Sequence, residues 1–593
     1  MLFLLAGLER MGEKMKRIFQ KMNLLLDQKQ KRTMMGLMVL MIIGAFLQMA
    51  SVGVLVETVN VVIDPEAVAK SNIAGKVYEL MGSPDFNIFS ITVMATLIVS
   101  FFVKNGFLYF QHKATLAFVY TNQFRTSERL MRNYLRRPYE FYLNADTAVI
   151  QRSITSDVNN MYALILALLQ LMSDGFMSLF VVSYCFMKNG VMTAVMASVM
   201  IVLMVIVKKV LKPILLKAGE DNQRFYSGLF KCIHQMVHGI KDVKVSGNEK
   251  YFVDQYQVCG KGYVECVQKY SLYNQIPKLL IETVCVTSMM LFIIVEILLG
   301  ISTENLMESL STLAAAAFVL LPAVNRINNQ INSITYLEPF FMGVADNLQD
   351  EISGENVDMT DFEKPVERME VQNQIELSDI TYAYPNTEKL IFDHANLLVP
   401  VGKSVGIVGT TGAGKSTVVD IMLGLLKLKS GKVLADGKDV LENYRGWLKN
   451  VGYIPQMSYM LDDTIRKNVA FGVQDEKIDD QRVWEVLKEA QMDSFVQSLP
   501  EGLNTKIGER GIRLSGGQRQ RISIARALYE DPKILILDEA TSAVDNDTEA
   551  AIMESINYFQ GKKTLLIIAH RLQTIEKCDI VYRVENGSVK QER

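Results

Sequence analysis

Residues 409–417, GTTGAGKST, are of the types that a loop needs in order to hold phosphate groups. The glycines allow backbone N–H groups to converge on an anion at the start of a helix, Lys415 would reach the terminal phosphates, and the Ser416 hydroxyl is a possible magnesium ligand. Apolar SVGIVG precedes the loop and VVDIMLGLL follows it, which predicts a strand, a phosphate loop and a helix. The predicted binding residues of this loop are Gly409, Thr410, Thr411, Gly412, Ala413, Gly414, Lys415, Ser416 and Thr417.

A second segment, KILILDEA at residues 533–540, ends in two adjacent carboxylates. The apolar run before them is typical of a buried parallel strand, whereas a surface strand with incidental acids would not carry ILIL. We expect Asp538 to hold magnesium and Glu539 to polarise an attacking water, because phosphoryl transfer leaves mainly positioning and electrostatics to the protein.

Between these segments lies LSGGQRQRISIARAL, residues 514–528, in which a serine and two glycines open an arginine-rich amphipathic helix. Alone, such a pair of glycines could be a helix cap. Together with the phosphate loop and the acidic strand, however, LSGGQ resembles the ATP-binding cassette (ABC) family over about residues 375–590. The resemblance implies ATP and Mg²⁺ as cofactors, and it implies that LSGGQ contacts the nucleotide of an opposite subunit through Ser515, Gly516, Gly517 and Gln518.

The resemblance assigns roles to further residues of this half. Tyr384 in ITYAYP matches the aromatic residue that stacks on adenine, and Gln456 in GYIPQ matches a loop glutamine that contacts magnesium and water and couples to the membrane domain. TKIGERG, residues 505–511, resembles a segment that exporters place near their intracellular helices. Asp545 in SAVD matches a dimer-contact loop, and His570 in IIAHR matches the switch histidine.

One chain carries one phosphate loop and one LSGGQ, so under this resemblance a closed site needs two chains. We expect a second copy of the same chain as the partner, and a heterodimer with a sister half remains the alternative.

Six apolar stretches in the first half are long enough to cross a bilayer, since a spanning helix needs about 20 mostly apolar residues. Lys and Arg gather in 9–32, 113–160 and 212–278, which places both termini and two long helical connections in the cytoplasm. The N-terminal segment predicts an amphipathic surface helix rather than a signal peptide. The predicted spans are 34–62, 88–111, 161–187, 191–207, 279–300 and 310–330.

The fold class predicted from both halves is an α-helical membrane domain of six transmembrane helices, of the exporter type, followed by an α/β P-loop ABC ATPase domain. The predicted boundaries are 1–345 for the membrane domain, 346–373 for an acidic linker and 374–593 for the ATPase domain. The net charge of −2 gives no electrostatic footprint for nucleic acid.

The membrane half also bears on the substrate. The segment 63–87 and LLPAVNRI at 320–327 resemble bacterial lipid-linked oligosaccharide flippases, which implies ATP-driven movement of an amphipathic substrate by alternating access. Arg326 and Lys104 would then attract a lipid pyrophosphate, as cations do. For Arg326 the competing interpretation is an arginine at a helix end that faces lipid headgroups.

Three other functions remain to be weighed. A multidrug, lipid or peptide exporter is the alternative within the family, although no peptidase domain precedes the spans. An ATP-gated channel or regulator is a separate class, which single-channel currents would reveal. A soluble ABC ATPase acting on DNA or ribosomes conflicts with six apolar spans. The expected location is a bacterial plasma membrane, with surrounding lipids as partners.

Overall fold

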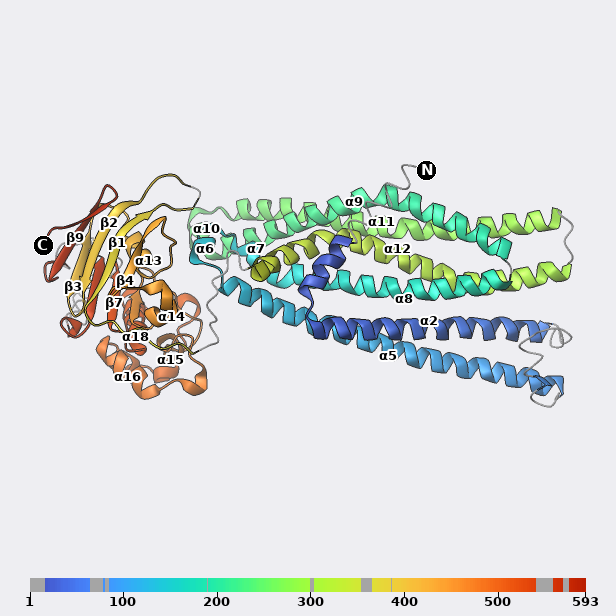
Figure 1. Cartoon of the computed structure of the whole chain (residues 1–593), viewed down its shortest axis with the longest axis horizontal. Coiled ribbons are helices and arrows are strands. Elements are labelled where there is room, and N and C mark those ends of the chain that lie inside the picture. Colours follow the sequence, from blue (N-terminus) through green and yellow to red (C-terminus); the bar gives the residue numbers. More distant parts are fainter. Residues whose placement is uncertain are drawn as a thin grey trace. The chain divides into compact units, whose positions relative to one another are not determined.

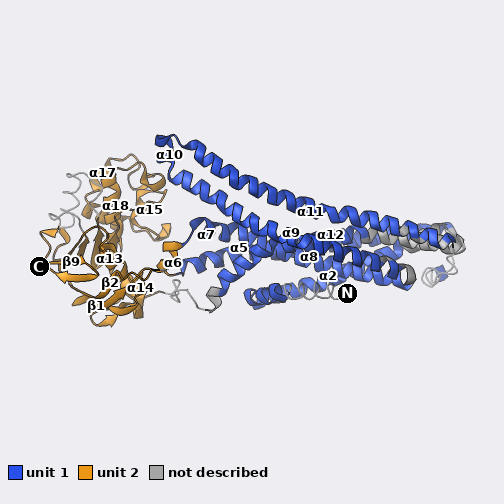
Figure 2. Cartoon of the chain, turned by 90° about the horizontal axis from the view of Figure 1, so that it is seen from above, with its two compact units in different colours: residues 1–137, 145–357 blue, residues 138–144, 358–593 orange. Residues whose placement is uncertain are grey.

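The computed structural model describes residues 16–63, 78–79, 85–188, 190–298, 303–353, 365–385, 387–539, 558–568 and 575–593 (Figure 1). The chain divides into two compact units (Figure 2). The helical unit comprises Met1–Arg137 and Ala145–Val357, and the α/β unit comprises Pro138–Asn144 and Asp358–Arg593.

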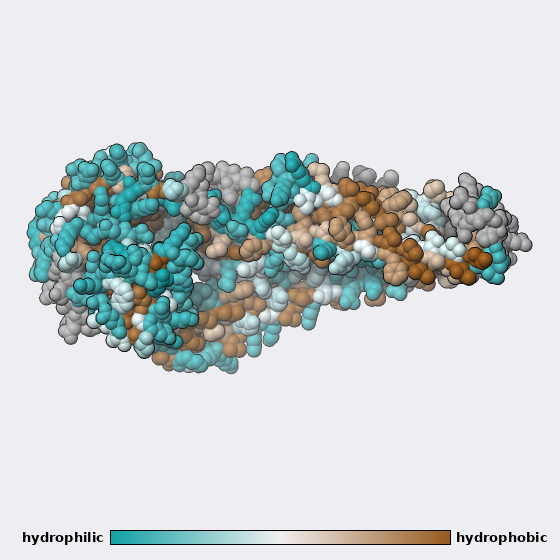
Figure 3. Space-filling view, turned by 90° about the horizontal axis from the view of Figure 1, so that it is seen from below, coloured by the Kyte–Doolittle hydropathy of each residue, from teal (hydrophilic) through white to brown (hydrophobic). Residues whose placement is uncertain are grey.

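Long helices build the helical unit. Among the described residues, five helical segments are long and apolar enough to cross a membrane, and hydrophobic side chains gather on their surface (Figure 3). The sixth predicted span lies within α12, of which residues 303–320 are described by backbone alone. The elements are α2 Gln28–Ile63, α5 Phe86–Leu135, α7 Thr147–Arg152, a π-helical turn Ser153–Asp157, α8 Val158–Lys188, α9 Gly190–His238, α10 Ile240–Ser246, α11 Glu249–Leu298 and α12 Thr303–Ser353.

Several helices extend well beyond the predicted spans. α5 continues to Leu135, α9 continues to His238, and α11 begins at Glu249, so the predicted helical connections are confirmed. α12 continues through Ser353, and residues 346–353 of the predicted linker are therefore helical. The segment 63–87 lies largely outside the described residues.

Small residues bring some of these helices into close contact. A Cβ atom added at Gly219 of α9 would lie 2.2 Å from the backbone oxygen of Tyr336 in α12. At Gly262 of α11 it would lie 2.5 Å from the ring of Phe225 in α9. Small residues at helix crossings let backbones approach in membrane bundles. α9, α11 and α12 therefore depend on glycine where they cross.

Two sheets form the centre of the α/β unit. The antiparallel sheet has the order β2-β1-β4-β5, and the second sheet has the order β10-β9-β3-β8-β7-β6, parallel except for the β10–β9 pair. The strands are β1 Gln374–Tyr382, β2 Phe392–Pro400, β3 Ser404–Val408, β4 Ser430–Ala435, β5 Lys438–Asp439, β6 Val451–Ile454, β7 Ile534–Asp538, β8 Thr564–Ile568, β9 Ile580–Glu585 and β10 Ser588–Gln591.

Both faces of the parallel sheet are covered, as continuous apolar strands require. In β7, Ile534 and Ile536 join a cluster with the antiparallel sheet and α13, whereas Leu535 and Leu537 join a cluster with α15 to α18. The fully buried Trp447 donates from Nε1 to the backbone oxygen of Met422, at the end of α13. The helices of this unit are α6 Tyr139–Asn144, α13 Lys415–Met422, α14 Tyr444–Leu448, α15 Ile465–Val469, α16 Asp480–Glu489, α17 Asp493–Ser498 and α18 Gly516–Tyr529.

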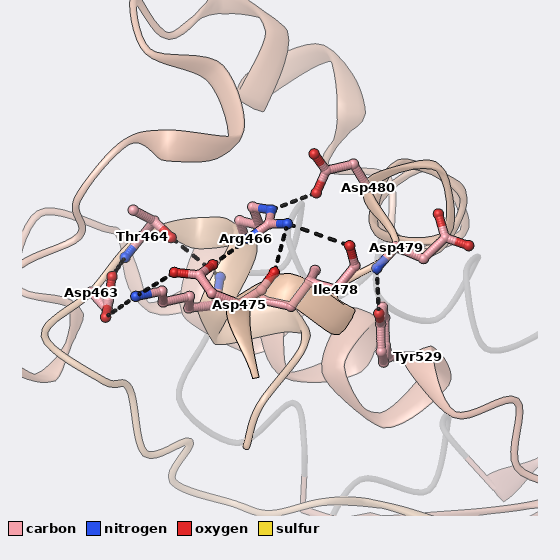
Figure 4. A network of polar contacts seen from close by, with 9 residues as sticks. Asp463, Thr464, Arg466, Asp475, Ile478, Asp479, Asp480 and Tyr529 are labelled. Carbon is pink, nitrogen blue, oxygen red and sulfur yellow. Dashed lines mark hydrogen bonds and ion pairs between the residues drawn. The ribbon is translucent and has the colours of Figure 1, made fainter. Parts of the chain in front are cut away.

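A polar network joins α15, α16 and α18, which lie on the face of the parallel sheet that carries Leu535 and Leu537 (Figure 4). Arg466 of α15 pairs with Asp475, at 2.5 Å between Nη1 and Oδ1, and with Asp480 at the start of α16. The backbone N–H of Asp479 donates to the hydroxyl of Tyr529 at the end of α18, over 3.0 Å. These contacts fix α16 against α18, the helix that begins within LSGGQ.

Candidate functional site

The phosphate loop connects β3 to α13 at the end of the parallel sheet. β3 is buried throughout and lies between β8 and β9. A Cβ atom at Gly409 would lie 2.5 Å from the backbone oxygen of Val584, and Gly414 has a φ of 104° and lies against Phe392. A side chain at either position would clash or be strained. The path of the loop therefore requires glycine at both positions.

The first residues of α13 present their polar groups around this loop. Lys415 is only 5% exposed, and its Nζ donates to the backbone oxygens of Gly409 at 3.1 Å and Thr410 at 3.2 Å. The hydroxyls of Tyr384 and Thr417 lie 3.0 Å apart. The predicted adenine-stacking residue is thus linked directly to the phosphate loop. The ammonium group and the helix N-terminus together favour a polyphosphate anion.

Asp538 lies at the end of β7, beside the start of α13. Ser416 Oγ donates to its Oδ1 over 3.2 Å, and the Tyr453 hydroxyl donates to its Oδ2 over 3.3 Å. Burial raises the pKa of Asp538, and the hydrogen bond from Ser416 opposes that shift. A serine hydroxyl beside a carboxylate is the donor set that Mg²⁺ accepts in phosphate loops. The residues present therefore fit a magnesium ion.

Glu539 follows directly but points to a different partner. Gln456 Nε2 donates to Glu539 Oε2 over 2.8 Å, so two of the predicted catalytic residues meet. The backbone of Glu539 has a φ of 50°, a left-handed conformation that costs energy for a residue with a side chain. Its N–H donates to the backbone oxygen of Ile568 over 3.1 Å, which helps to hold this turn.

LSGGQ forms the start of α18. Ser515 and Gln518 make a reciprocal capping box, with the Gln518 N–H donating to Ser515 Oγ and the Ser515 N–H donating to Gln518 Oε1. Arg526 anchors the helix through bonds of 2.7 Å to the Tyr459 oxygen and 2.8 Å to the Asn468 oxygen. Within the described parts of the chain, no hydrogen bond or ion pair joins the segment 515–518 to the phosphate loop.

Other predicted site residues lie elsewhere. His570 and Asp545 fall outside the described residues. In the helical unit, Arg326 of α12 makes a two-point contact with Asp174 of α8, with Nε 2.9 Å from Oδ1 and 3.2 Å from Oδ2. Lys104 of α5 lies over the ring of its neighbour Phe101, 4.1 Å from the centroid.

Three features near the site were not identified from sequence. The first is Tyr453 of β6, although it stands in the GYIPQ segment that contains Gln456. The second is Asp420 of α13, whose pKa is raised to about 6 by burial and by Asp538. The third is the contact that α6 makes within the α/β unit, where the Glu140 carboxylate accepts a hydrogen bond from the Lys427 N–H over 3.0 Å.

Comparisons with known proteins match both halves of the chain. The family model described as ABC transporter matches residues 392–542, and the model of the ABC transporter transmembrane region matches residues 33–321. A solved structure of a bacterial Atm1-family ABC exporter with ATP bound has a TM-score of 0.76 and 20% identity, and it covers 94% of this chain and 95% of that one. This likeness confirms the predicted fold class.

Curated relatives agree with the family models. The ATP-dependent lipid A-core flippase of Desulfotalea psychrophila is 27% identical over 512 residues, which are 85% of this chain and 87% of that protein. The protein of the same name from Pectobacterium atrosepticum is 42% identical over 219 residues, which are 37% of this chain and 38% of that protein. ABC transporter B family member 1 of Arabidopsis thaliana is 40% identical over 231 residues, which are 39% of this chain and 18% of that protein.

Proposed function

This chain is an ABC half-transporter, with a membrane-spanning region and an ATPase domain that couples ATP hydrolysis to translocation, and we propose which residues perform the hydrolysis and what is translocated. The pairing of Gln456 with Glu539, at 2.8 Å beside the phosphate loop, is the observation that carries the catalytic assignment.

Glu539 serves as the general base for the attacking water. A carboxylate is suited to accept a proton from water, and the amide of Gln456 fixes its orientation. Lys415 and the loop N–H groups of residues 409–417 bind the phosphates, and Tyr384 stacks on the base. His570 completes the site as the switch residue, a role that rests on its match to the family motif alone.

Mg²⁺ is the second cofactor, with Ser416, Asp538 and Gln456 as its protein contacts. When bound, the ion neutralises charge on the phosphate oxygens. Ser416 and Asp538 already share a hydrogen bond of 3.2 Å, so their oxygens lie close enough to serve one ion. Gln456 reaches the same region through its contact with Glu539.

The working unit is a homodimer in which Ser515, Gly516, Gly517 and Gln518 of one chain close on the nucleotide of the other. The capping box holds Ser515 at the start of α18, where the helix N-terminus favours an anion. We place the end of the transmembrane domain at Ser353, the last residue of α12, instead of at the predicted residue 345; a linker then runs to residue 373 and the ATPase domain covers 374–593. Both termini are cytoplasmic, in the inner membrane of a bacterium.

The translocated substrate is an anionic, sugar-bearing lipid of the lipid-linked oligosaccharide type. Relatives named lipid A-core flippases support a lipid substrate. Arg326 and Lys104 supply cations for its phosphate groups. The Arg326 side chain is 48% exposed while it pairs with Asp174, so a phosphate can compete with that carboxylate for the guanidinium. A multidrug or other lipid exporter is the alternative.

ATP hydrolysis by purified protein in lipid nanodiscs tests the catalytic assignment. We expect Glu539→Gln to lower the turnover at least a hundredfold while ATP binding persists, because only the base is removed. Glu530→Gln is the matched control, since Glu530 contacts Arg368 through its backbone rather than its carboxylate. Normal turnover in Glu539→Gln would refute the assignment.

The same preparation tests the substrate. A lipid-linked oligosaccharide, a lipid A-type glycolipid and unrelated amphipathic drugs are added in turn. We expect the lipid-linked sugar to change the turnover, and we expect Arg326→Gln to abolish that response while basal turnover persists. A response to the drugs alone would favour a multidrug exporter.

A further inference from the structure

Both carboxylate oxygens of Asp538 are held by hydroxyl groups from different elements. Ser416 of α13 bonds Oδ1 over 3.2 Å, and Tyr453 of β6 bonds Oδ2 over 3.3 Å. β6 lies directly beside β7 in the parallel sheet, with Tyr453 opposite Ile536 in the register. The tyrosine hydroxyl therefore reaches Asp538 from the neighbouring strand and bonds the carboxylate oxygen that Ser416 does not.

The two hydroxyls have different tasks. Ser416 is proposed to hold the same ion as Asp538, so its hydroxyl oxygen would itself be a metal ligand. Tyr453 carries no such assignment, and its phenol is a donor that remains protonated at neutral pH. Glu539 and Asp420 both carry charge that acts on this corner of the site. A donor fixed on Oδ2 opposes their repulsion and sets the rotation of the carboxylate.

We propose that Tyr453 is a positioning residue, which orients Asp538 for the magnesium ion through its hydroxyl. The inference rests on the proposed magnesium role of Asp538 and extends it to the group behind the ligand. Outer hydrogen bonds of this kind commonly contribute ten- to a hundredfold to metal affinity. Tyr453 stands three residues before Gln456, so β6 and the loop after it would support both the metal carboxylate and the proposed base.

Nucleotide binding with and without metal tests this inference apart from turnover. Full-length Glu539→Gln protein in nanodiscs, which should not hydrolyse ATP, is titrated with ATP in Mg²⁺ and again in EDTA. Adding Tyr453→Phe should weaken binding about tenfold in Mg²⁺ and leave binding in EDTA unchanged. Tyr582→Phe is the matched control, because it removes a buried tyrosine hydroxyl that donates to the Leu398 oxygen over 3.1 Å, away from the carboxylates.

Asp538→Asn separates the two proposals. If Asp538→Asn loses the effect of Mg²⁺ on binding but Tyr453→Phe keeps it, the positioning role is wrong and the metal assignment stands. If neither variant changes the effect of Mg²⁺, both assignments fail. If Tyr453→Phe weakens ATP binding equally in Mg²⁺ and in EDTA, the hydroxyl supports only the fold, which also overturns the inference.

Discussion

Asp538 and Glu539 are adjacent in sequence but occupy different environments. Asp538 is the last residue of β7, is 7% exposed and receives hydroxyl donors on both oxygens. Glu539 leaves the strand at a φ of 50° and meets the amide of Gln456. The abrupt change of backbone direction would let Asp538 hold the proposed metal while Glu539 acts on the proposed attacking water.

A third carboxylate, Asp420, makes the stability of the α/β unit depend on pH. Burial and the nearby Asp538 raise its pKa to about 6, above its ordinary value of 3.8. Between these values the folded chain binds more protons than the unfolded chain, so stability falls as the pH rises from about 4 to 6 and stays lowered above it. The charged form of Asp420 therefore destabilises the α/β unit at neutral pH.

We expect Asp420→Asn to stabilise the α/β unit by about 1 kcal/mol at pH 7.5, a value reduced because the side chain is partly exposed. The gain should be about half as large at pH 5. Urea unfolding of the full chain, followed by tryptophan fluorescence, measures it, since both tryptophans, Trp447 and Trp484, lie in this unit.

The exposed Asp462 provides the control for that experiment, because Asp462→Asn should not change the urea midpoint at either pH. A gain from Asp420→Asn that is the same at pH 5 and pH 7.5 would contradict the electrostatic explanation and indicate a packing effect instead.

Among the helices, the crossing of α9 and α12 allows a direct test. We expect Gly219→Ala to destabilise the helical unit by about 1–3 kcal/mol, because the new methyl group would overlap the Tyr336 backbone oxygen and must push the helices apart. Gly106→Ala on α5 is the control, since a Cβ there meets nothing within 4 Å. The readout is the fraction of monodisperse protein after heating in detergent. Equal survival of both variants would contradict the close approach.

Local sequence signals identify most elements but not how they pair. Long apolar runs predict the spanning helices, and SVGIVG, the glycine-rich loop and ILIL predict the β3–α13 and β7 elements, because each signal lies within one segment. The contact of Tyr453 with Asp538 joins residues 85 positions apart, and that of Arg326 with Asp174 joins residues 152 positions apart. Periodicity and motif spacing do not encode such partners, so only the folded chain reveals them.

For the whole molecule, the proposed site composed of two chains predicts which mutant chains can rescue each other. One chain carries Lys415→Ala and the other carries Ser515→Arg. Their mixed dimer retains one site with an intact phosphate loop and an intact LSGGQ, so we expect ATP hydrolysis well above that of either mutant alone. Two different affinity tags allow the mixed dimer to be purified and its turnover measured in nanodiscs.

The matched control places both substitutions on one chain and pairs it with wild type. Each composite site of that dimer then contains one defect, and we expect little turnover. Half of the wild-type turnover in this control, with none in the rescuing pair, would show that each chain completes its own site.

The central position of β7 also limits how the length of this chain can change during evolution. β7 pairs with β6 and β8, and its alternate side chains fill two separate clusters. Deleting one residue from the turn at 531–533 would move Glu539 into the position of Asp538 and turn every apolar side chain of the strand to the opposite face. Insertions and deletions should therefore be rare before β7 and should accumulate at open turns such as Gly472, where a Cβ meets nothing within 4 Å.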